Sequence, residues 1–117
     1  MAGEKIAEGG SESPRLDAEV LLAHLTGLQR VDLYMNRTRV LTDEENSQYQ
    51  QMVNRRSHGE PVAYITGVKE FWSKTVRVTK DVLIPRPETE ILVERVLSLC
   101  PDRNAPVEIL DLCTGSG

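Results

Sequence analysis

The spacing of apolar residues divides the chain into parts with different patterns. Over residues 13–67 the apolar positions recur three or four residues apart, which predicts helices. The strongest signal lies at 13–27, where Pro14 suits a first helical turn and Gly27 suits a helix end. Further helices are predicted at 30–36, 41–59 and 60–67. Thr42 and Glu45 have the spacing of a reciprocal cap at the start of the second of these. We therefore expect a mainly α, helical bundle in this part of the chain.

Residues 68–86 show a strand-like pattern instead. Val76 and Val78 stand two residues apart, and β-branched and aromatic residues are frequent around them. The pair Phe71–Trp72 should place its two rings on opposite faces of a strand. A Thr-Lys-Asp stretch at 79–81 is typical of a turn. The pattern predicts a β-hairpin linker that uses this turn.

The last part, residues 87–117, returns to a helical pattern at 87–100 and then changes again. The run VEILDL at 107–112 is short and almost continuously apolar, as in the buried strands of parallel sheets. Because a parallel strand needs neighbouring strands, it cannot form a domain by itself. We expect only the first helix and the first strand of a larger α/β domain, cut off inside that domain.

Residues 1–12 are predicted to form a flexible N-terminal arm. Gly9, Gly10 and Ser11 dominate the end of this stretch, and such residues favour flexible chain. No continuous apolar segment resembles a secretory signal. The ordered part of the chain is therefore expected to begin at the helix over 13–27.

The composition narrows the class of protein. Of 117 residues, 39% are hydrophobic and 27% are charged, which fits a globular protein. The net charge of -4 argues against direct nucleic-acid binding, because that depends on clustered lysines and arginines. Cys100 and Cys113 provide neither a disulfide framework nor metal-ligand spacing. No stretch approaches the roughly 18 apolar residues of a membrane span, so we expect a cytoplasmic protein.

The clearest candidate for chemistry is the sequence DLCTGSG at 111–117. In doubly wound α/β folds, glycines after a strand let the backbone approach a ligand. The stretch lacks the lysine of a phosphate-binding loop, and the same pattern is typical of a plain turn. On the pattern alone, both the ligand-site and the plain-turn interpretations stay open.

Other chemically capable side chains have simpler structural interpretations. His24 lies in a predicted helix, His58 ends another, and no third ligand stands at metal spacing, so no metal site is expected. Glu88 and Glu90 open a predicted helix, where the helix dipole favours acidic residues.

Three segments follow one another in a specific order: GEPVAYITGVKEF at 59–71, LIPRPETE at 83–90 and DLCTGSG at 111–117. In this order and spacing they resemble the HemK/PrmC family. Members of that family methylate the side-chain amide of a glutamine in peptide chain release factors. The resemblance covers residues 13–117, because the segment at 13–27 is similar to an early helix of the family. Each segment alone is unspecific, but their combination is highly specific.

The resemblance implies a helical substrate-docking domain at 13–67, a hairpin linker at 68–86 and the start of a Rossmann-like methyltransferase domain at 87–117. That last domain binds S-adenosylmethionine in the family. The implied cofactor-binding residues are Asp111, Cys113, Thr114, Gly115, Ser116 and Gly117. Many members carry glycine at the position of Cys113, and we interpret its thiol as a packing group rather than a nucleophile.

The catalytic motif of the family, Asn-Pro-Pro-Tyr, does not occur in this sequence. A delocalised amide nitrogen is a poor nucleophile, so an enzyme must hold it and aim it at the methyl carbon. We therefore expect the parent protein to be the enzyme that uses S-adenosylmethionine. The chain itself is expected to contain no catalytic residue, to bind no cofactor and to be inactive. The resemblance implies that Arg86 and Glu90 support the site.

Two other functions stay open. The helical region could act alone as a module that docks a release factor, without catalysis. Its predicted helix at 41–59 has a polar face that suits either recognition or solvation, formed by Gln48, Gln51, Asn54 and Arg55. A nucleotide-binding fold with other chemistry, such as a dehydrogenase, would leave LIPRPETE unexplained. Apolar surface left by a truncated sheet would favour self-association.

Overall fold

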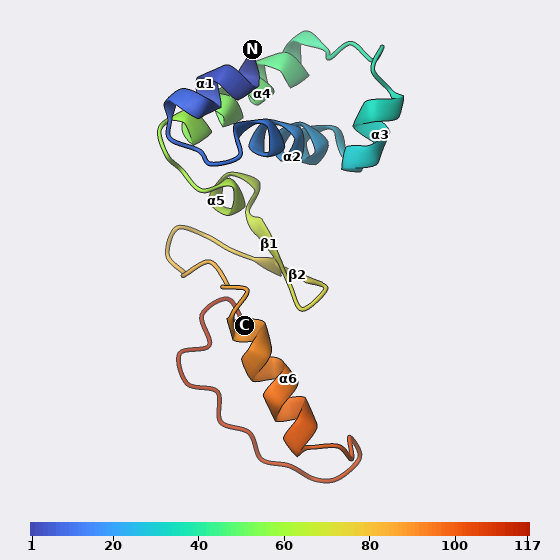
Figure 1. Cartoon of the computed structure of the whole chain (residues 1–117), viewed down its shortest axis with the longest axis vertical. Coiled ribbons are helices and arrows are strands. Elements are labelled where there is room, and N and C mark those ends of the chain that lie inside the picture. The colour runs from blue at the N-terminus through green and yellow to red at the C-terminus, as the bar shows by residue number, and fades with distance from the viewer. The chain divides into compact units, whose positions relative to one another are not determined.

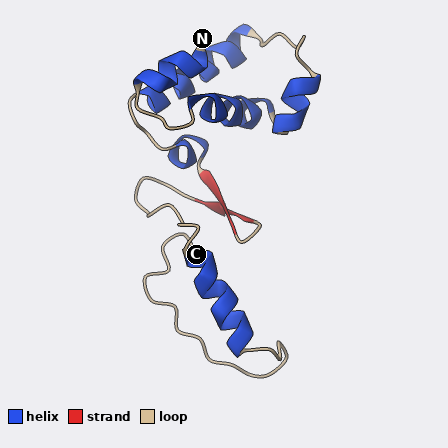
Figure 2. Cartoon of the chain, in the orientation of Figure 1, coloured by secondary structure: helices blue, strands red, loops and turns tan.

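Helices account for most of the regular structure, and one short hairpin interrupts them (Figures 1 and 2). The computed structural model describes all residues from 1 to 117 and divides them into two units, Met1–Thr66 and Gly67–Gly117. The first unit contains α1 (Ala2–Glu8), α2 (Pro14–Thr26), α3 (Arg30–Met35), α4 (Asp43–Ser57) and α5 (Val62–Thr66). The second contains β1 (Val68–Phe71), β2 (Lys74–Arg77) and α6 (Thr89–Leu99).

Four helices of the first unit each contribute one buried side chain to a common core. These side chains are Ile6 from α1, Leu21 from α2, Val53 from α4 and Ile65 from α5. The helices predicted over 13–67 are therefore confirmed, and the core between them is small and aliphatic. Because so few side chains are buried, each one carries a large share of the hydrophobic stabilisation.

The prediction of a flexible arm at 1–12 is wrong. Residues Ala2–Glu8 form α1, and Ile6 is fully buried in the core. After α1 the chain passes so close to the C-terminal end of α4 that only glycine fits at position 9. A Cβ added to Gly9 would overlap the backbone carbonyl of Ser57. The glycines that indicated flexibility therefore include one that permits a close backbone approach.

The predicted helix ends agree well with the structure. Thr42 and Glu45 form a reciprocal cap on α4, in which the Glu45 amide donates to Thr42 Oγ1 at 3.1 Å and the Thr42 amide donates to Glu45 Oε2 at 3.0 Å. Gly27 follows α2 with a φ of 69°, in the left-handed conformation that commonly ends helices. Ser13 precedes α2, but its side chain makes no capping hydrogen bond.

Polar contacts tie α2 to α4 beside the core. Arg56 Nε lies 2.7 Å from Asp17 Oδ2, and the Ser11 hydroxyl donates to the same oxygen at 2.6 Å. The Tyr49 hydroxyl donates to the backbone carbonyl of Ala18 at 3.0 Å. Since the Arg56 and Asp17 side chains are only 18% and 16% exposed, solvent screens this ion pair weakly.

In the second unit, β1 and β2 pair in antiparallel register from Val68 opposite Arg77 to Phe71 opposite Lys74. The hairpin prediction is confirmed, but the predicted position of the turn is wrong. Trp72 and Ser73 form the turn, with φ values of 50° and 55°. Positive φ at both positions gives the backbone twist that two-residue hairpins favour. Trp72 therefore lies in the turn and not on a strand face.

Helix α6 confirms the helical prediction for 87–100, whereas the predicted strand at 107–112 is absent. Residues 107–112 are exposed, including Ile109 at 69% and Leu110 at 81%. A parallel strand forms only when neighbouring strands satisfy its amide and carbonyl groups. The hairpin is the only sheet in the structure, and it does not pair with this segment. Separately, none of the helices combines the length and apolar character needed to cross a membrane.

Candidate functional site

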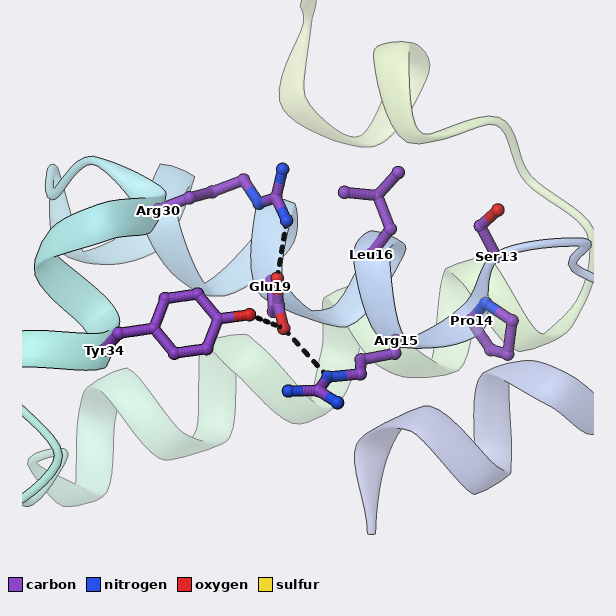
Figure 3. A pocket seen from close by; sticks show the side chains of 7 residues that line it. All are labelled: Ser13, Pro14, Arg15, Leu16, Glu19, Arg30 and Tyr34. Carbon is purple, nitrogen blue, oxygen red and sulfur yellow. Dashed lines mark hydrogen bonds and ion pairs between the residues drawn. The ribbon is translucent and has the colours of Figure 1, made fainter.

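The first unit contains a surface pocket between α2 and α3, with a volume of about 350 Å³ (Figure 3). It is lined by Ser13, Pro14, Arg15, Leu16, Glu19, Arg30 and Tyr34. Figure 3 shows the Arg15, Arg30 and Tyr34 side chains pointing toward Glu19. Pro14 and Leu16 supply the apolar part of the lining. The pocket thus combines a carboxylate, two guanidinium groups and an apolar wall.

Glu19 is the centre of this arrangement. The Tyr34 hydroxyl donates to Glu19 Oε1 at 2.6 Å, Arg30 Nη2 donates to Oε2 at 2.8 Å and Arg15 Nε donates to Oε1 at 3.1 Å. These hydrogen bonds, first that of Tyr34 and then that of Arg30, lower the pKa of Glu19 to about 2. The carboxylate is therefore ionised at neutral pH and has no proton to donate. Its role is to hold α3 against α2.

The hydrogen bonds of Glu19 should be lost in acid. Because its pKa in the folded state lies below the ordinary value of 4.5, the stabilisation is fully present above pH 4.5 and is lost as the pH falls through about 2. An NMR titration of the Glu19 carboxyl carbon should give a midpoint near the lower value, and the Tyr34 ring signals should shift with it. Glu19→Gln removes the titrating group and serves as the control. A midpoint near 4.5 would contradict the observed geometry.

The sequence did not indicate this cluster. The sequence could predict only the contact between Arg15 and Glu19, because these residues are four apart on one helix. Arg30 and Tyr34 belong to another helix, and nothing in the spacing indicates that they converge on Glu19. The polar face predicted on α4 is exposed, at Gln48, Gln51, Asn54 and Arg55. One member of that face, Arg55, already pairs with Glu60 through two hydrogen bonds.

The residues predicted to bind a cofactor form an exposed turn in the second unit. The Thr114 hydroxyl donates to the Asp111 carbonyl at 3.3 Å, and the Gly117 amide donates to the Thr114 carbonyl at 3.3 Å. Cys113 and Gly115 have positive φ values of 62° and 66°. The backbone therefore turns sharply here, as a ligand-binding glycine loop requires. Asp111, Cys113, Thr114, Gly115 and Gly117 are exposed, and Ser116 is half-buried.

Arg86 and Glu90 are not joined to each other by a hydrogen bond. Glu90 Oε1 instead accepts a hydrogen bond at 2.9 Å from the Trp72 amide in the hairpin turn. This contact fastens the turn to α6 and stabilises a backbone conformation that non-glycine residues rarely adopt. The Arg86 side chain is exposed, while its carbonyl accepts from the Thr89 amide at the start of α6. Glu90 thus has a structural contact that the sequence did not indicate.

Both histidines are exposed, and His58 Nδ1 lies 2.7 Å from the Asn54 carbonyl at the end of α4. No group of three His, Cys, Asp or Glu side chains comes together with metal-binding geometry. The structure therefore offers two local arrangements for function, the pocket at Glu19 and the exposed turn at 111–117.

Comparisons with known proteins match both units. Residues 1–67 match the sequence model of the PrmC N-terminal domain, including residues 1–12. The chain is 47% identical over 112 residues to a release factor glutamine methyltransferase of Rhodopirellula baltica, covering 92% of the chain and 38% of that relative. Similar proteins with this name from Leptospira interrogans and Escherichia coli are 51% and 50% identical, over 90% and 92% of the chain. The chain spans 37% and 38% of their lengths.

Proposed function

Because this chain belongs to the PrmC N-terminal domain family, we propose that it is the N-terminal part of an S-adenosylmethionine-dependent protein methyltransferase. The substrate is the side-chain amide nitrogen of a glutamine in a peptide chain release factor. The observation that carries the proposal is the identity of about half of all aligned residues to relatives named release factor glutamine methyltransferase, over nine-tenths of the chain.

The two units take different roles in this proposal. The helical unit, Met1–Thr66, docks the protein substrate, and residues 87–117 begin a Rossmann-like domain that binds the cofactor. Exposed apolar side chains support the second assignment. Ile91 and Leu92 on α6 and Ile109 near the end of the chain are each more than 60% exposed. These side chains would be covered if 107–112 paired into a larger parallel sheet with helices on its faces.

The turn at 111–117 has the small residues and the backbone conformation that a cofactor-binding loop needs. Gly115 and Gly117 have no side chains, and Cys113 and Gly115 already have the positive φ values that bring amides toward one side of a turn. In the proposal, the amides after Asp111 hold the amino-acid part of S-adenosylmethionine. The bound cofactor supplies the methyl group. Arg86 and Glu90 support this region through the hairpin and the start of α6.

The chain itself is proposed to be inactive. Methylation of an amide requires acceptor groups that hold the NH2 group in line with the methyl carbon. The sequence lacks the Asn-Pro-Pro-Tyr motif whose groups would do this.

A chimeric enzyme tests the function. This chain replaces the corresponding N-terminal part of the Escherichia coli relative, to which it is 50% identical. With a release factor and methyl-labelled S-adenosylmethionine, the chimera should transfer one methyl group to a glutamine, located by peptide mass spectrometry. The chain alone should transfer none. If the unmodified relative is active and the folded chimera is not, the proposed function is wrong.

A second candidate function is a docking module without catalysis. The observation that favours it is that the helical unit has its own core and its own capped helices. Binding of a release factor by the chain alone, together with an inactive chimera, would support this alternative.

A further inference from the structure

Helix α3 is the one helix of the first unit that buries no side chain. Val31 and Met35 on α3 are 68% and 79% exposed, and Tyr34 is 43% exposed. A helix of six residues gains too little from its own hydrogen bonds to persist alone, so α3 depends on the contacts of Arg30 and Tyr34 with Glu19. Polar contacts with Glu19 thus keep α3 in place while its apolar side chains stay exposed at the surface.

This helix face continues into the pocket at Glu19. Tyr34 and Met35 follow Val31 by three and four residues, so all three lie on one side of α3. Leu16, which is 41% exposed, lines the pocket together with Tyr34. We call the set Leu16, Val31, Tyr34 and Met35, with the flanking Arg15 and Arg30, the α3 surface. Apolar side chains grouped at the surface and rimmed by charges are typical of protein interaction sites.

The charges of the α3 surface define the partner that fits it. The bonds to Glu19 use only Nε of Arg15 and Nη2 of Arg30, whereas a guanidinium group has five N–H donors. Arg15 and Arg30 are 82% and 48% exposed, so donors remain for another acceptor. Residues 28–40 contain three arginines and one aspartate, in a chain whose net charge is -4. Arg30 and Arg39 are each paired with a glutamate, whereas Arg37 is exposed and has no acidic partner. This region is locally basic, and its partner should be acidic.

Resting on the proposed function, we infer that the α3 surface docks a segment of the release factor that carries an apolar side chain between carboxylates. The apolar side chain enters the pocket beside Leu16 and Tyr34. The carboxylates accept hydrogen bonds from Arg15 and Arg30. Glu19 is a positioning residue in this arrangement, because it orients both guanidinium groups and already accepts three hydrogen bonds within the protein.

Binding of a release factor to the 117-residue chain tests the inference, measured by interferometry at low and high salt. Val31→Glu and Met35→Glu each place a negative charge on the α3 surface and should weaken binding by at least about tenfold. Both side chains are largely exposed, so these variants should keep the helical circular dichroism. Gln51→Glu adds the same charge on the exposed face of α4 and should leave the affinity unchanged. High salt should weaken the binding of the unmodified chain.

The same substitutions in the chimera separate this inference from the proposed function. They should raise the KM for the release factor and leave kcat unchanged, because the α3 surface acts in docking and not in the chemical step. If the chimera methylates with an unchanged KM in Val31→Glu and Met35→Glu, the docking inference is wrong and the proposed function stands. If the folded chimera does not methylate the release factor while the unmodified relative does, the proposed function is wrong, and the binding measurement alone then tests the docking inference.

Two further outcomes would overturn the inference. Weaker binding in Gln51→Glu but not in Met35→Glu would place the docking site on α4. Sedimentation showing that the chain dimerises and that Met35→Glu restores the monomer would mean that a second copy covers the α3 surface.

Discussion

Ile6→Ala is expected to lower the free energy of unfolding of the helical unit by about 2–5 kcal/mol, the usual cost of removing a large aliphatic side chain from a core. Ile6 is fully buried and is one of four side chains in the core cluster. The loss combines the transfer of apolar surface to water with the cavity left between α1, α2 and α4. In a core this small, the surrounding helices have few other buried contacts to compensate for that loss.

Urea unfolding followed by circular dichroism measures this effect. Lys5→Ala is the matched control, because Lys5 precedes Ile6 in α1 and is exposed. We expect a midpoint near that of the unmodified chain for Lys5→Ala and a much lower midpoint for Ile6→Ala. Equal midpoints for the two variants would show that α1 does not pack on the core and would restore the interpretation of residues 1–12 as an arm.

Gly9→Ala is expected to destabilise the same unit by about 1–3 kcal/mol through overpacking. The φ of Gly9 is −79°, which alanine adopts without strain, so the whole effect comes from lack of space. The added Cβ would meet backbone atoms of Ser57, and backbone cannot rotate away as a flexible side chain can. The C-terminal ends of α1 and α4 must therefore separate, which opens the core at Ile6 and Val53.

Gly3→Ala, inside α1, provides the control for Gly9→Ala, which lies at the residue directly after this helix. The nearest atom to a Cβ at Gly3 is the Arg15 Cα at 3.9 Å, an ordinary contact distance. Since glycine inside a helix costs about 0.5–1 kcal/mol relative to alanine, Gly3→Ala should raise the unfolding midpoint. Opposite shifts for the two variants are the expected result. A midpoint for Gly9→Ala at or above that of the unmodified chain would exclude the close approach at Ser57.

Features that depend on neighbouring residues were predictable from the sequence. The cap formed by Thr42 and Glu45, the start of α2 at Pro14 and its end at Gly27 all match expectation. These signals work because each hydrogen bond or backbone preference involves residues within one helical turn. Local sequence patterns likewise predicted α6 and the existence of a hairpin before it.

Features that depend on distant residues were not predictable. The hairpin turn at Trp72–Ser73 lacks the Asn-Gly type of sequence that indicates such turns, and it is instead stabilised by Glu90 on α6. The Glu19 cluster requires α3 to fold back on α2. The strand predicted at 107–112 does not form, although its apolar pattern is typical of a buried strand. Such a strand needs neighbouring strands to pair with, and the structure contains none beside this segment.

The sequence by itself therefore determined where most helices begin and end, that a hairpin separates two helical regions, and to which family the chain belongs. These follow from short-range capping, backbone preferences and a distinctive order of segments. Only the tertiary structure decided that Ile6 belongs to the core, that Gly9 must lack a side chain and that Arg15, Arg30 and Tyr34 meet at Glu19. The physical reason is that burial, steric exclusion and ion pairing between helices depend on distances in space, which the spacing of residues along one helix does not contain.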